Sequence, residues 1–75
     1  MNNYFIINYK TGKGLSQFLP QDSRRSPFRF NNNSVMSFAT IEEAEKQLQS
    51  IITRTPAQHK RAALNLRVSM YAKGF

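Results

Sequence analysis

The sequence predicts a small α+β domain with a β-hairpin, a long basic loop, a short strand, one amphipathic helix over about 41–53 and a C-terminal strand. Three patterns support this prediction. Apolar residues recur at helical spacing after Thr40, and aromatic and β-branched residues fill the segment near the N-terminus. Near the C-terminus, apolar and polar residues alternate strictly. With 75 residues and no internal repeat, the chain 1–75 is expected to form a single domain.

The N-terminal segment 4–10, YFIINYK, favours a β-strand because aromatic and β-branched residues suit a pleated, partly buried backbone. Apolar side chains fall on both of its faces, so we expect a central strand or one that is covered on both sides. Residues 11–14, TGKG, hold two glycines that suit a tight turn. Residues 15–19 would then return as the second strand of a hairpin, which Pro20 ends.

Residues 20–34, PQDSRRSPFRFNNNS, are expected to form a long polar loop. The loop holds an interleaved basic and aromatic cluster of Arg24, Arg25, Phe28, Arg29 and Phe30. Two interpretations of this cluster are open. In the first, exposed phenylalanines stack on bases while the arginines bind phosphates. In the second, Phe28 and Phe30 point into the core from a short edge strand, and only the arginines stay outside.

Residues 35–52 predict a short strand followed by the helix. Thr40 is a favourable N-cap, and Glu43 three residues later completes a capping box. The apolar face of the helix comprises Ile41, Ala44, Leu48, Ile51 and Ile52. Three of the four acidic residues of the chain, Glu42, Glu43 and Glu45, lie near the start of the helix, where its dipole favours negative charge. We therefore expect this helix to be scaffold, with the binding surface elsewhere.

The segment after the helix has two interpretations. Thr55 before Pro56, with Gln58 three residues on, predicts the cap of a second short helix. Apolar residues then alternate with polar ones over 64–72, which favours a strand. The alternative is a second helix, because many of these residues are good helix formers. We favour the strand, preceded by a helical turn at 56–62.

Charge is the main functional indication. Eleven Lys and Arg residues against four Asp and Glu give a formal net charge of +7. Outside residues 41–46, ten basic residues face Asp22 alone, which leaves +9 on the rest of the chain. A partner with a negative surface is the first expectation. The alternative is that this charge only keeps a small domain soluble.

The sequence thus predicts a small basic accessory protein that binds nucleic acid, RNA or a single strand in particular, through the arginine-rich loop and a basic sheet face. Lys10 and Tyr4 are expected on an outward face of the first strand. Because phosphate contacts dominate such binding, the affinity should fall steeply with salt. The candidate binding residues are Arg24, Arg25, Phe28, Arg29, Arg54, Lys60, Arg61, Arg67, Tyr71 and Lys73.

A protein partner is the alternative. Basic proteins with arginine and aromatic hot spots dock on acidic surfaces. A small, asparagine-rich chain without cysteine also resembles, in composition, the accessory proteins that bacteriophages and plasmids encode. This alternative describes an inhibitor or modulator of a host enzyme, such as a nuclease. The sequence leaves the oligomeric state open, a homodimer included.

The sequence gives catalysis little support. His59 is the only histidine, and no carboxylate is placed to orient it as a general base, so we expect no enzyme; a basic ribonuclease acting through His59 is the catalytic alternative. With no cysteine and with three of the four acids on one helix, we expect neither a metal nor another cofactor. The lack of cysteine and of an apolar run near ~18 residues predicts a cytoplasmic protein.

One short segment resembles a known domain. Residues 37–48, SFATIEEAEKQL, are similar to the end of the small hybrid-binding domain at the N-terminus of some ribonucleases H, where a phenylalanine-rich strand runs into a similar helix start. The earlier part of that domain, an aromatic strand with its own helix, has no counterpart in residues 1–30. The sequence therefore assigns no family.

Overall fold

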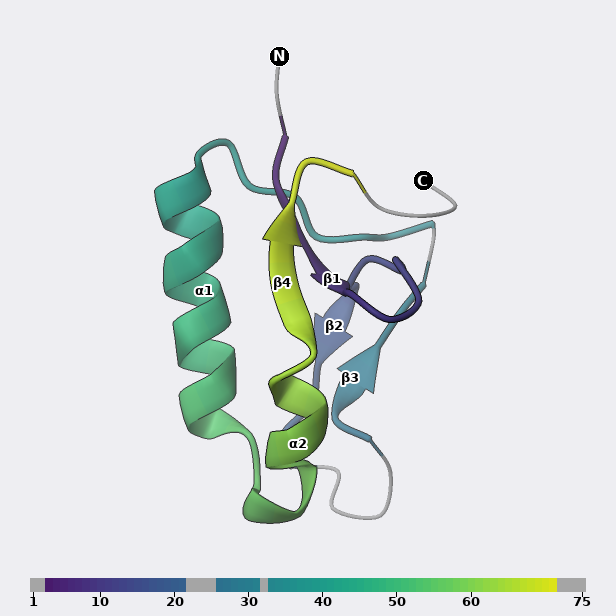
Figure 1. The fold of residues 1–75 in the computed structure, drawn as a ribbon, viewed down its shortest axis with the longest axis vertical. Coiled ribbons are helices and arrows are strands. Elements are labelled where there is room, and N and C mark those ends of the chain that lie inside the picture. Colours follow the sequence, from purple (N-terminus) through teal and green to yellow (C-terminus); the bar gives the residue numbers. More distant parts are fainter. Residues whose placement is uncertain (1–2, 22–25, 32, 72–75) are drawn as a thin grey trace.

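The computed structural model describes residues 3–21, 26–31 and 33–71. Along the chain, the elements are β1 (Phe5–Asn8), β2 (Gln17–Phe18), β3 (Phe28–Arg29), α1 (Ile41–Arg54), the 3-10 helix η1 (Ala57–His59), α2 (Lys60–Ala63) and β4 (Leu66–Ser69). They form one small domain in which α1 lies along β1 and β4, while β2 and β3 lie on the other side of β1 (Figure 1). The α+β class predicted from the sequence is confirmed.

Strand β1 lies at the centre of the structure. On one edge it pairs antiparallel with β4, so that Phe5 lies opposite Ser69 and Asn8 opposite Leu66. On its other edge, the backbone N–H of Leu15 donates to the carbonyl of Ile6 over 2.7 Å. Phe5 and Ile6 point to opposite faces and are both buried. The expectation of a central strand, drawn from apolar residues on both faces, is confirmed.

The predicted hairpin is correct in its turn and wrong in the partner of its second strand. Gly12 takes a positive φ of 79° in the turn, a conformation that glycine adopts without steric cost. The returning chain pairs with β1 only at a single bridge, between Ile7 and Gly14. Beyond it, β2 turns away and pairs antiparallel with β3, because Ser16 donates its backbone N–H (2.7 Å) and its hydroxyl (2.9 Å) to the carbonyl of Arg29.

The loop predicted over 20–34 therefore contains a strand, whereas the short strand expected between it and the helix is reduced to a single bridge. Residues Phe28–Arg29 form β3, as the second interpretation of the arginine-rich cluster required. Residues 35–38 make only one bridge, between Tyr4 and Phe38, together with a hydrogen bond from the N–H of Met36 to the carbonyl of Leu15 over 3.1 Å. This segment crosses the molecule in an extended conformation and leads into α1.

Helix α1 agrees closely with its prediction. The Thr40 hydroxyl accepts a hydrogen bond from the N–H of Glu43 over 3.2 Å, which is the N-cap contact expected from the sequence. Ala44 and Ile51 are fully buried on the inner face, while Ile41 at the first position stays 43% exposed. The helix ends at Arg54, one residue beyond the predicted end.

The segment after α1 confirms the favoured interpretation of a helical turn followed by a strand. Helices η1 and α2 occupy residues 57–63, and β4 occupies Leu66–Ser69 within the predicted range. The predicted role of Thr55 is wrong. Its buried hydroxyl donates to the carbonyl of Ile51 over 2.6 Å, so it bonds back to α1 instead of capping the next helix.

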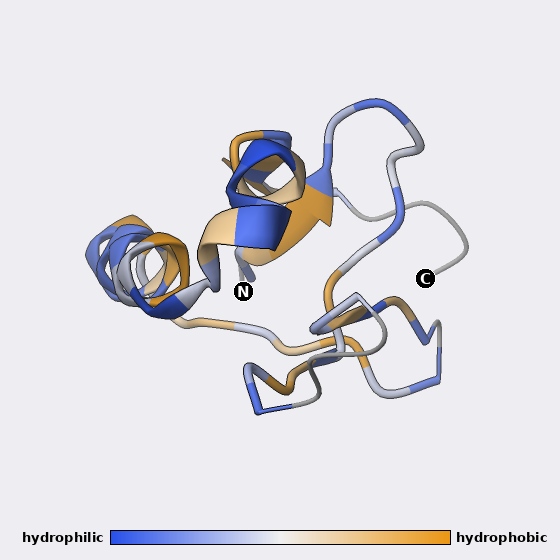
Figure 2. Ribbon diagram, turned by 90° about the horizontal axis from the view of Figure 1, so that it is seen from below, coloured by the Kyte–Doolittle hydropathy of each residue, from blue (hydrophilic) through white to orange (hydrophobic). Residues whose placement is uncertain are grey.

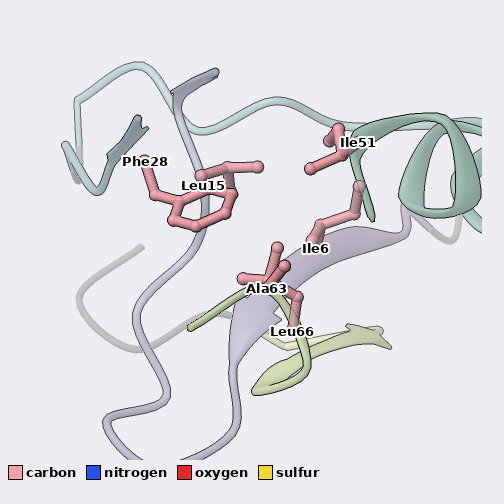
Figure 3. Close-up of a cluster of buried hydrophobic side chains, with 6 residues drawn as sticks. All are labelled: Ile6, Leu15, Phe28, Ile51, Ala63 and Leu66. Atoms are coloured by element: carbon pink, nitrogen blue, oxygen red, sulfur yellow. The ribbon is translucent and has the colours of Figure 1, made fainter. Parts of the chain in front are cut away.

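The core joins both sheets to α1 and α2. Ile6, Leu15, Phe28, Ile51, Ala63 and Leu66 form one buried cluster (Figure 3). Phe28 and Leu15 approach it from the side of β3, whereas Ile51 comes from α1 and Leu66 from β4. The four strands hold only twelve residues, so this shared cluster is what fixes the two sheets relative to each other.

Candidate nucleic-acid interface

Six of the eight described Lys and Arg residues lie in two parts of the surface, and Arg29 and Lys46 lie outside both. One part, here called the Tyr9 surface, comprises Tyr9, Lys10, Lys13 and Arg67 at the turn after β1 and the start of β4. The other, here called the α1 end, comprises Phe18, Arg54, Lys60 and Arg61, where α1 finishes and η1 and α2 follow. Figure 2 views the molecule from this end and shows hydrophilic residues along α2 and along the turn after β1. Three predicted residues, Arg24, Arg25 and Lys73, lie outside the described residues.

An arginine–aromatic pair forms the centre of the Tyr9 surface. The Cζ atom of Arg67 lies 5.1 Å from the centroid of the Tyr9 ring, within the range of a cation–π contact. The register explains the contact, because Ile7 lies opposite Arg67 and Tyr9 follows on the same face two residues later. The Arg67 guanidinium is held further by hydrogen bonds from Nη1 to the carbonyls of Leu64 and, over 2.7 Å, Leu66.

Both members of this pair remain open to solvent. Tyr9 is 53% exposed, and Arg67 is also exposed. The ring and the guanidinium are flat groups whose positions are fixed by the sheet and by the hydrogen bonds of Arg67. A fixed, exposed pair of this kind can stack on a nucleobase with little loss of side-chain freedom.

The turn after β1 places two lysines beside Tyr9. Asn8 organises this turn, because its carbonyl accepts the N–H of Gly12 over 2.7 Å and its side chain accepts the N–H of Lys10 over 2.9 Å. The Asn8 N–H in turn donates to the carbonyl of Lys13 over 3.0 Å. Lys10 and Lys13 are exposed at the tip. The turn that follows Tyr9 thus carries two exposed lysines.

The tyrosines differ from the sequence-based expectation. Tyr4 was expected on an outward face, but it is half-buried and bridges Phe38. Tyr71 is 81% exposed, as expected of a binding residue. It follows the end of β4, where its N–H donates to the Ser69 hydroxyl over 3.0 Å. Tyr9, which the sequence placed on a strand face without a role, is the exposed tyrosine beside an arginine.

At the α1 end, Lys60 has a structural role. Its ammonium group donates to the carbonyl of Ile52 over 2.6 Å and to that of Thr53 over 3.4 Å. These carbonyls belong to the last turn of α1, where unpaired acceptors and the helix dipole favour a cation. The charge of Lys60 is therefore directed at the protein itself, whereas its neighbour Arg61 is exposed.

Arg54 also contacts its own chain. Its Cζ atom lies 5.6 Å from the centroid of the half-buried Phe18 ring. Phe18 in turn stacks on Phe28, with ring centroids 5.6 Å apart and an angle of 24° between the rings. Phe28 is only 5% exposed, so the structure corrects its assignment as a base-stacking residue: its ring is part of the core. Arg29 beside it is half-buried and donates from Nη1 to the carbonyl of Ser26 over 3.0 Å.

His59, the residue of the catalytic alternative, lies in η1 at the same end. Its Nε2 atom is 3.4 Å from Nε2 of Gln58, and Lys60 and Arg61 follow it in the chain. Within the described residues, no group of three or more His, Cys, Asp or Glu side chains is arranged to hold a metal ion. The same residues contain no helix that is long and apolar enough to cross a lipid bilayer.

Comparison with known proteins gives no assignment: no family model, no curated protein and no solved structure matches this chain. The geometry of the two basic regions is therefore the basis from which a function can be inferred.

Proposed function

We propose that this protein binds single-stranded nucleic acid, RNA or DNA, through the Tyr9 surface. The observation that carries the proposal is the exposed Tyr9 ring with the Arg67 guanidinium 5.1 Å from its centroid. Base stacking on an exposed aromatic ring contributes about 1–3 kcal/mol per base and tolerates any sequence, because every base has a π-face. Arginine adds a second flat surface and hydrogen-bond donors for phosphate.

The distribution of charge favours a single strand over a duplex. The helix suited by length to enter the major groove of DNA is α1, with 14 residues. Its exposed side carries Glu42, Glu43 and Glu45, which would face phosphates unfavourably. The Tyr9 surface offers instead a sheet edge and a turn, and an unpaired strand can lay its bases on such a surface.

Lysines of the turn supply the phosphate contacts in this proposal. Lys10, Lys13 and Arg67 are all exposed; Arg67 contacts the Tyr9 ring, and the two lysines lie in the turn that follows Tyr9. If three phosphates are neutralised, log K should fall with log salt at a slope of about −2 for a single strand. The affinity should then drop roughly 15-fold between about 50 mM and about 200 mM salt. Binding in the cytoplasm, as an accessory to enzymes that handle RNA or DNA, fits a chain without cysteine.

Fluorescence anisotropy with a labelled oligouridine of about 12 nucleotides, long enough for one small domain, tests the proposal. Tyr9→Ala should weaken binding by roughly 5- to 100-fold, the equivalent of one lost stacked base. Tyr9→Phe keeps the ring and should bind within about twofold of wild type. Arg61→Gln is the control for net charge, because it removes one exposed cation at the α1 end, away from the Tyr9 surface; we expect a small, salt-sensitive loss.

The outcomes separate this proposal from its alternatives. Equal binding of wild type and Tyr9→Ala would mean that only net charge acts, and the stacking site would be rejected. Tighter binding to duplex than to the single strand would reject the preference for unpaired strands. If no nucleic acid binds at about 50 mM salt, where phosphate contacts are strongest, the proposal fails and the protein-partner alternative takes its place.

A further inference from the structure

Strand β4 forms an open edge of the main sheet. The N–H of Tyr9 donates to the carbonyl of Asn65 over 3.0 Å, so residues of odd number in β4 direct their backbone groups toward β1. Leu66 and Val68, which alternate with them, direct theirs to the other side. Among the described residues, no strand pairs with that side of β4.

Only part of this edge is closed by the protein itself. The Arg67 guanidinium donates to the carbonyls of Leu64 and Leu66 and covers the beginning of the edge. The N–H and carbonyl of Val68 have no hydrogen-bond partner among the described residues. Val68 thus presents an unpaired donor and an unpaired acceptor, the groups through which an edge strand pairs with another chain.

A groove runs between this edge and α1. Its lining combines apolar and charged side chains: Ile41, Glu42, Glu45, Lys46, Leu48, Gln49, Arg67 and Val68. Two acids and two bases make the formal charge of this lining zero in a chain that carries +7. Two copies of the chain repel each other through most of their surface, but they can meet at this groove without like charges facing each other.

We propose that two copies of this chain form a homodimer by antiparallel pairing of their β4 strands at Val68. The N–H of Val68 in each copy donates to the carbonyl of Val68 in the other, and the two main sheets become one continuous sheet. In each copy, α1 packs against the strand pair β1 and β4. Neighbouring strands lie about 4.8 Å apart, so two such pairs that meet at β4 hold their α1 helices about 10 Å apart. Helices pack at this distance.

The charges of the groove then become complementary. A two-fold axis that passes between residues 45 and 46 places Glu45 of each copy opposite Lys46 of the other, because the two helices run antiparallel. Ile41 and Leu48 are covered in the same step, which explains why Ile41 is 43% exposed in the isolated chain. The dimer also brings the two Tyr9 rings onto the face of the joined sheet opposite the helices, because Tyr9 alternates along the strand with Ile6, which packs in the core with Ile51 of α1.

Charge exchange tests the dimer. Sedimentation velocity of nucleic-acid-free protein should show a dimer for wild type. Glu45→Lys and Lys46→Glu should each weaken self-association by roughly tenfold or more, because each brings like charges together across the axis. An equimolar mixture of the two variants should form a heterodimer, since the changed residues are then complementary. Arg61→Glu, the same charge change at the α1 end, should leave the dimer intact.

Hydrogen exchange of the Val68 amide reports on the strand pairing itself. The Val68 amide should exchange slowly at concentrations where the dimer forms and quickly on dilution, while the Arg67 amide, bonded to β1, stays protected at both. The inference is overturned if wild type is monomeric, or if both charge variants dimerise as wild type does. It is equally overturned if a dimer forms and the Val68 amide still exchanges quickly.

Discussion

Arg67 and Arg54 make the same contact in two regions that differ in almost everything else. Each guanidinium lies within 6 Å of an aromatic centroid, at 5.1 Å for Arg67 over Tyr9 and at 5.6 Å for Arg54 over Phe18. Tyr9 is 53% exposed, at the end of a strand and the start of a turn. Phe18 is half-buried and stacks on Phe28 in the core.

The difference shows that an arginine–aromatic contact does not by itself define a binding site. At the α1 end, the guanidinium covers a ring whose other side already packs in the protein, so the pair completes the scaffold. At the Tyr9 surface, Tyr9 keeps 53% of its accessible area, which leaves the pair open to the ligand that we propose. Exposure of the aromatic partner therefore distinguishes the two roles.

The largest expected effect comes from truncating the two rings. Phe18→Ala should destabilise the protein by about 2–3 kcal/mol, because it removes a ring that packs on Phe28 and leaves a gap beside the core. Tyr9→Ala should cost no more than about 0.5–1 kcal/mol, since the ring is mainly exposed. Urea unfolding followed by far-UV circular dichroism measures both values. Equal losses would contradict the assignment of the two regions to scaffold and surface.

A smaller difference is expected between two lysines. Lys60→Met should destabilise the protein by about 1 kcal/mol, because the ammonium group no longer bonds the last carbonyls of α1. Lys10→Met, which removes the same charge from the turn, should change stability by less than about 0.5 kcal/mol. The same unfolding experiment applies. If high salt abolishes the effect of Lys60→Met, the contribution comes from long-range charge and not from the hydrogen bonds.

Local signals explain which parts of the fold the sequence predicts. The start of α1 is visible in Thr40 and Glu43, and its inner face in the spacing from Ala44 to Ile51, so each feature lies within a few residues of its partner. β4 is predictable from the alternation over 64–72 for the same reason. The β2–β3 pair is not, because two-residue strands have no period, and their pairing depends on Ser16 meeting Arg29 thirteen residues later.

The candidate site follows the same division. Arg67 and Tyr71, two candidate binding residues in the alternating segment 64–72, are both exposed. The contact of Arg67 with Tyr9 depends on the register that sets Ile7 opposite Arg67. Arg67 and Tyr9 are fifty-eight residues apart in the chain, so no local pattern predicts their contact. The burial of Phe28 and the hydrogen bonds from Lys60 to the end of α1 are also tertiary contacts, so no local pattern predicts them.

The smallest expected effect comes from making the same Arg→Lys exchange in each of the two arginine–aromatic pairs. Arg67→Lys keeps the charge but loses the flat guanidinium, so it should weaken binding of the labelled oligouridine by roughly threefold to tenfold. Arg54→Lys makes the same exchange over Phe18 and should leave binding within about twofold, because that pair offers no exposed ring to a base. Neither change should alter stability by more than about 0.5 kcal/mol. Equal losses of binding in the two variants would place a second contact surface at the α1 end, and the exposure of the aromatic ring would then no longer distinguish a binding arginine from a structural one.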